Sequence, residues 1–99
     1  MAENDDLANR FGSRFAPNED GTRSLHVIAL EIASDWTKVN YAASPYLQAM
    51  DTLDKVTDAY YADSAASIVR YFLANANTWR GETARRVKAE LKEMIKGVY

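Results

Sequence analysis

Residues 63–76 read DSAASIVRYFLANA and carry the most regular pattern in the chain. The apolar residues of this stretch recur at intervals of three or four and are Ala65, Ile68, Val69, Phe72, Leu73 and Ala76. This spacing places them on one stripe of a helix, because an α-helix turns once in about 3.6 residues. Asp63 or Ser64 can serve as the N-cap, since both side chains accept a hydrogen bond from a free amide. The segment therefore predicts a buried amphipathic helix ending near residue 76.

Three further stretches share this periodicity and predict helices over residues 23–39, from residue 44 to about residue 56, and over residues 82–96. Thr22 or Ser24 can cap the first of these helices. Ser44 is a preferred cap for the second. Pro45 then occupies the first helical position, where the missing amide hydrogen loses no bond.

The connections between these stretches complete the predicted architecture. In the first predicted helix, Val27 and Leu30 widen the stripe that faces the core. The periodicity fails near residues 58–62, which predicts a loop or a helix break. Residues 75–81 predict a short turn, in which Trp79 fills the groove between neighbouring helices. No alternating strand pattern appears, so the sequence predicts an all-α bundle of three to four helices.

The length of 99 residues allows one domain. Residues 1–20 are acidic, lack sustained periodicity and predict a flexible, partly disordered tail. An equally weighted alternative is a short amphipathic turn that docks on the body through Leu7, Phe11 and Phe15. Residues 21–98 form the predicted helical bundle domain.

Composition excludes several classes of protein. No stretch approaches the roughly 20 apolar residues that a membrane-spanning helix needs, so we expect no membrane partner. The first residues, MAENDDLANR, are acidic where a signal peptide would be basic and then apolar, which predicts a cytoplasmic protein. The chain has no cysteine, so disulfides, thiolate nucleophiles and zinc–cysteine sites are excluded.

Charge divides the chain into acidic and basic parts. Residues 21–64 hold six acidic and three basic residues, whereas residues 65–99 hold seven basic and three acidic residues. The favoured interpretation is that an acidic helix packs beside a basic one, within the chain or between copies. The alternative is a surface for nucleic acid or for an acidic partner.

The sequence offers no arrangement suited to catalysis or metal binding. His26 is the only histidine, and we interpret it as a boundary residue beside the apolar stripe. Asp51, Asp54 and Asp58 are spaced to share one helical face, but Lys55 lies among them and hard cations prefer ligands from converging segments. A solvated face is the favoured interpretation. We expect no catalytic residue, no metal and no cofactor.

The last predicted helix carries a basic stripe that consists of Arg85, Lys88, Lys92 and Lys96. With the preceding helix and turn it resembles a helix-turn-helix outline, in which this helix would contact DNA. Glu90 and Glu93 on the adjacent face would repel phosphates, and the short side chains expected to contact base edges (Asn, Gln, Ser) are missing from its exposed positions. A solvated face is therefore favoured over contact with nucleic acid or another anion.

Tyrosine is abundant, with six residues, and it is a residue type enriched at interfaces. Tyr60 and Tyr61 fall where the helical pattern breaks. Together with Trp79 and Arg80 they form the predicted partner-binding surface.

Three segments carry a resemblance to a known group of proteins: VNYAASPY at residues 39–46, DSAASIVRYF at residues 63–72, and FLANANTWRGETARRVKAELKEM at residues 72–94. Over about residues 39–96 the chain resembles small uncharacterised helical proteins of actinobacterial phages and prophages. The resemblance implies a cytoplasmic protein made during infection or lysogeny. Such proteins bind a host protein, regulate transcription or sequester a defence signal.

The favoured function is stoichiometric binding of a protein partner, from the bacterial host or the phage, by a non-enzymatic protein. Self-association into a homodimer or higher oligomer is compatible with it. One alternative is a DNA-binding regulator that uses the basic helix. Another is an oligomeric sponge for a small anionic nucleotide, held by tyrosine stacking and basic side chains.

Overall fold

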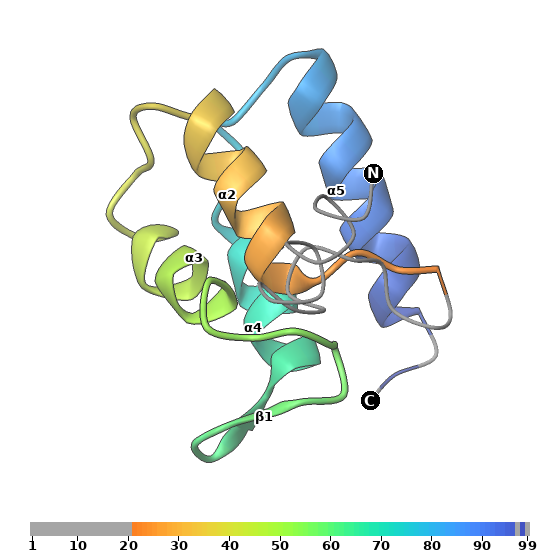
Figure 1. Cartoon of the computed structure of the whole chain (residues 1–99). Coiled ribbons are helices and arrows are strands. Elements are labelled where there is room, and N and C mark those ends of the chain that lie inside the picture. The colour runs from red at the N-terminus through yellow and green to blue at the C-terminus, as the bar shows by residue number, and fades with distance from the viewer. Residues whose placement is uncertain (1–20, 97, 99) are drawn as a thin grey trace, which may run out of the picture.

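The computed structural model describes residues 21–96 and residue 98, and the fold of these residues is mostly helical (Figure 1). The described elements, in order, are α2 (Leu25–Asp35), α3 (Ser44–Met50), β1 (Ala59–Tyr60), β2 (Asp63–Ser64), α4 (Ala65–Ala74) and α5 (Glu82–Ile95). A mostly helical fold is thus confirmed, but the small antiparallel sheet was not predicted. The predicted tail at residues 1–20 lies outside the described residues.

The helices form a closed ring of contacts around one core. Helix α2 contacts α3 and α5, and α4 contacts the same two helices, as Figure 1 shows. Val69 and Phe72 of α4 are fully buried in this core. The α4 stripe was predicted from the sequence, and so was its cap, because the Ser64 hydroxyl accepts a hydrogen bond from the Ser67 amide at 3.1 Å.

Helix α2 ends at Asp35, four residues earlier than expected. Its C-cap is Trp36, whose backbone leaves the helical region with φ −96° and ψ 83°. The indole of Trp36 stacks on that of Trp79, with ring centroids 5.9 Å apart and planes 12° apart. The packing of this buried indole pair therefore accompanies the end of the helix.

Helix α3 is shorter than predicted, and its cap differs from the prediction. The helix begins at Ser44 with Ala43 as its N-cap, so Ser44 does not cap it. It ends at Met50 because the following residues serve α2: the carbonyls of Leu53 and Asp54 accept hydrogen bonds from the first amides of α2, at 2.9 Å each.

The predicted break near residues 58–62 is a β-hairpin. Ala59 pairs with Ser64 and Tyr60 with Asp63, across a turn in which Tyr61 has φ +54°. Left-handed backbone is costly for a residue with a side chain, by roughly 1–2 kcal/mol. The turn is therefore imposed by the structure around it and not by local preference.

Helix α5 matches its predicted range within one residue, and charged side chains join it to α2. Arg23 donates through Nε to Glu90 at 2.9 Å and through its terminal nitrogen to Glu90 and Glu31, at 2.7 and 2.8 Å. Arg86 donates to the second oxygen of Glu31. We refer to these four residues as the Arg23 cluster, and it closes the seam between α2 and α5.

Candidate functional site

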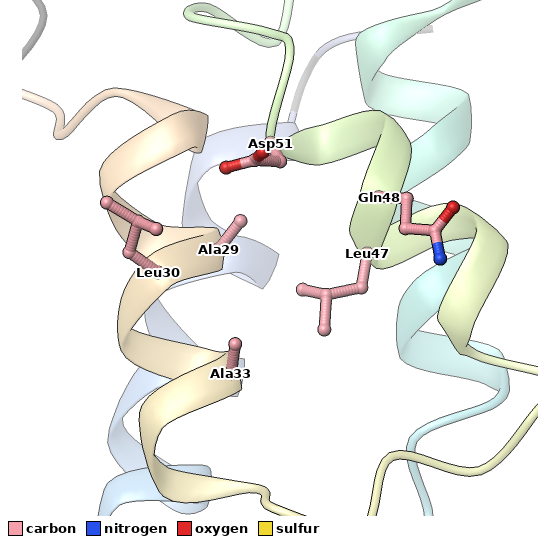
Figure 2. A pocket seen from close by; sticks show the side chains of 6 residues that line it. All are labelled: Ala29, Leu30, Ala33, Leu47, Gln48 and Asp51. Carbon is pink, nitrogen blue, oxygen red and sulfur yellow. The ribbon is translucent and has the colours of Figure 1, made fainter.

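A groove lies between α2 and α3 and has a volume of about 270 Å³. Its lining residues are Ala29, Leu30, Ala33, Leu47, Gln48 and Asp51, which Figure 2 shows. We call it the α2–α3 groove. Ala29 and Ala33 face Leu47 across the gap between the two helices (Figure 2). The short side chains of the two alanines, one helical turn apart, leave the space unfilled.

Leu30 forms an exposed apolar edge of the groove. The sequence pattern placed this residue on the buried stripe, but its side chain is 46% exposed. The most buried residues of α2, namely Leu25, Ile28 and Ile32, lie along one side of the helix, whereas Leu30 and Ala33 lie off that line and contact solvent. The groove was not predicted from the sequence, because it depends on how α3 packs beside α2 and no local pattern signals that packing.

One end of the groove is acidic and held in place by α2. The Nδ1 atom of His26 lies 2.9 Å from the Asp51 carboxylate and 2.7 Å from the Asp51 carbonyl. The carboxylate of Asp51 remains half exposed. His26 thus positions an acidic group at the rim of an apolar surface.

The three aspartates of the predicted second helix do not share a face. Asp51 lies at the groove, whereas Asp58 accepts hydrogen bonds from the amides of Asp54 and Lys55, at 3.1 and 2.9 Å. Among the described residues, no group of three or more histidine and acidic side chains is placed to hold a metal ion. Asp58 instead organises the turn that leads into the hairpin.

The two hairpin tyrosines form an edge-to-face pair, with ring centroids 4.8 Å apart and planes at 82°. Tyr60 is half-buried against the core, whereas Tyr61 is 91% exposed. The hairpin therefore presents one aromatic side chain to solvent and anchors it through the other.

Trp79 and Arg80 are adjacent in the chain but differ in exposure. Trp79 is 2% exposed, and its indole nitrogen donates to Asp35 at 2.8 Å. It fills the space between helices, as the sequence pattern indicated, so its ring is unavailable to a partner in this structure. Arg80 is exposed, and α4 separates it from the hairpin tyrosines along the chain.

Arg85, Lys88 and Lys92 lie on one flank of α5, with Lys96 at its C-cap, whereas Arg86 lies on another flank and binds Glu31. What we call the basic strip consists of Arg80, Arg85, Lys88, Lys92 and Lys96. Residues 79–88 also line a shallow pocket of about 350 Å³ at the start of the strip. Of the two glutamates expected to weaken this surface, Glu90 is bound to Arg23, whereas Glu93 is exposed.

Among the described helices, none combines the length and apolar character needed to cross a membrane. Comparison of the chain with protein-family models, curated proteins and solved structures gave no match.

Proposed function

We propose that this protein acts by stoichiometric binding without turnover, and that the α2–α3 groove accepts an amphipathic helix of a protein partner. The observation that carries this proposal is the exposed side chain of Leu30 beside the apolar floor formed by Ala29 and Leu47. Burial of apolar surface is favourable by roughly 25 cal/mol per Å². A partner that covers Leu30 therefore gains affinity from contact with a groove that already exists.

The shape of the groove favours a helix as its occupant. Ala29 and Ala33 are separated by one helical turn, and small residues at that spacing let a second helix approach closely. Leu47 provides the opposite wall. A helix of the partner can insert one large aliphatic or aromatic side chain here, in the manner of helix-in-groove recognition.

Charge defines the rest of the partner's chemistry. The Asp51 carboxylate lies at one end of the groove, and residues 21–64 carry twice as many acidic as basic residues. Arg23 is already bound to Glu31 and Glu90. The complementary helix carries a leucine or phenylalanine flanked by lysine or arginine.

The proposal can be tested with labelled helical peptides built from leucine and lysine, or from leucine and glutamate. We expect fluorescence anisotropy to show binding of the lysine peptide and weaker binding of the glutamate peptide. Leu30→Ser and Ala33→Leu, which remove the apolar edge and fill the groove, should each weaken binding about tenfold, or about 1.4 kcal/mol. Tyr41→Ser is the matched control, because Tyr41 is 91% exposed and outside the groove.

Equal binding of both peptides, or equal affinity of all three variants, would contradict the proposal. Self-association that Ala33→Leu abolishes would make a second copy of the chain the occupant. Tyr60, Tyr61 and Arg80 add contacts only if the partner extends beyond the groove. If the resemblance to phage proteins holds, the partner is a host or phage protein in the bacterial cytoplasm.

A further inference from the structure

No carboxylate among the described residues neutralises the positive charges of the basic strip. Its members follow a spacing of three and four along α5, after Arg80 in the preceding turn, and all are exposed except the half-buried Lys88. Within residues 21–96, none of them forms an ion pair with a carboxylate. From Arg85 to Lys96 the row extends about 17 Å at roughly 1.5 Å per residue.

The Arg23 cluster explains why these charges remain unpaired. Glu90 is held by Arg23, and Arg86 is held by Glu31, so both side chains turn toward α2. Glu93 shares that flank of the helix by its position, and Glu82 stands between the two flanks in the first turn. The Arg23 cluster thus keeps Glu90 away from the basic strip, whereas Glu82 and Glu93 remain exposed beside it.

The start of the strip holds its cations close together. Lys88 donates to the Trp79 carbonyl at 2.7 Å and lies 5.8 Å from the centre of the Trp79 ring. Burial lowers the pKa of Lys88, and the nearby charges of Lys92 and Arg80 lower it further. An anion in the adjoining pocket would relieve this repulsion between like charges.

We propose that the basic strip binds the phosphate backbone of a nucleic acid without reading its bases. A strand of B-DNA presents one phosphate per roughly 3.4 Å, so a row of this length faces several phosphates at once. A single small anion would engage only the pocket. Lysine and arginine on the flank of a helix suit backbone contact, and the strip has no asparagine, glutamine or serine side chain for contacts to base edges. The net charge of residues 65–99 is positive, and salt screens more distant acidic groups beyond about 8 Å.

The test is a titration of the full chain with fluorescein-labelled duplex and single-stranded DNA of about 20 nucleotides, at about 50 to 200 mM salt. We expect the affinity for both to fall with salt, with a log–log slope of about −3 for duplex if three or four phosphates are contacted. Arg85→Glu combined with Lys92→Glu should weaken binding at least about tenfold and flatten the slope. Lys38→Glu is the control, because Lys38 is exposed in the loop between α2 and α3.

Circular dichroism of each variant separates lost binding from lost folding. Equal weakening by Lys38→Glu, salt-independent binding or no binding would overturn the proposal. Equally tight binding of polyglutamate, or full displacement by free nucleotide at the same phosphate concentration, would overturn it in favour of an acidic protein or a small anion. Leu30→Ser should leave DNA binding unchanged, so this proposal and the groove proposal can fail separately.

Discussion

The two flanks of α2 are built in opposite ways. On the side of α5, the Arg23 cluster joins the helices through charge-assisted hydrogen bonds, and α5 runs fourteen residues from Glu82 to Ile95. On the side of α3, the neighbouring helix has only seven residues and leaves Leu30 and Ala33 exposed. Ion pairs thus close one side of α2, whereas the other side borders the α2–α3 groove. The groove is where binding is proposed.

The largest expected effect on the free energy of unfolding comes from removing the Arg23 side chain between α2 and α5. Arg23→Ala leaves two half-buried carboxylates without their shared donor. We expect it to lower the free energy of unfolding by about 2–3 kcal/mol, because hydrogen bonds to charged groups are worth roughly 1.5–3 kcal/mol and are not additive. Urea denaturation measures this change. Lys38→Ala, the control, should stay within about 0.5 kcal/mol. A similar loss in both variants would show that the cluster does not stabilise the seam.

Replacing an alanine by leucine, once in the core and once in the groove, compares the packing of the two sites. Ala65→Leu places a larger side chain at a fully buried position of α4 and should cost about 1–3 kcal/mol. Ala33→Leu places the same side chain in the groove and should change stability by less than about 0.5 kcal/mol. The difference in urea midpoint between the two variants is the measurement. Equal destabilisation would mean that the groove is closed in solution.

The smallest expected effect is on how the free energy of unfolding depends on pH. Hydrogen bonds from Arg86 lower the pKa of Glu31 below its ordinary value of 4.5, and those from Arg23 lower it further against the opposing effect of burial. Near that pH the unfolded chain binds more protons at this group than the folded chain does. The stability that Glu31 contributes is therefore present above pH 4.5 and is lost as the pH falls through the lowered pKa.

Urea denaturation between about pH 6 and about pH 3 measures this contribution. Glu31→Gln should show a shallower loss of stability on acidification than the natural chain. Asp63→Asn, at an exposed position in the hairpin, is the control for a carboxylate outside the cluster. An unchanged slope in Glu31→Gln would assign the acid sensitivity to other carboxylates.

The sequence could predict what local periodicity and capping determine. It predicted α4, with Ser64 as one of two candidate caps, and it predicted α5 almost to the residue, because the apolar spacing lies within each segment. It missed the end of α2 at Trp36, which accompanies stacking on a residue 43 positions later in the chain. The Arg23–Glu90 contact spans 67 residues, and no local pattern signals it.

The candidate site was less predictable than the fold for the same reason. Leu30 was assigned to the buried stripe from the sequence, but it lies off the line of Leu25, Ile28 and Ile32 and is 46% exposed. Trp79 was assigned both to the core and to a contact surface, and the structure places its ring in the core. The basic residues of α5 could be identified from the sequence. The ion pair with Arg23 that holds Glu90 could not.

The most direct test of the central claim is an NMR titration of the isotopically labelled chain with the leucine–lysine helical peptide. The account predicts saturable shifts of the signals of Ala29, Ala33 and Leu47, with α4 and the hairpin unchanged. Shifts confined to Tyr60 and Tyr61, or to the basic strip, with the groove signals unmoved, would contradict it.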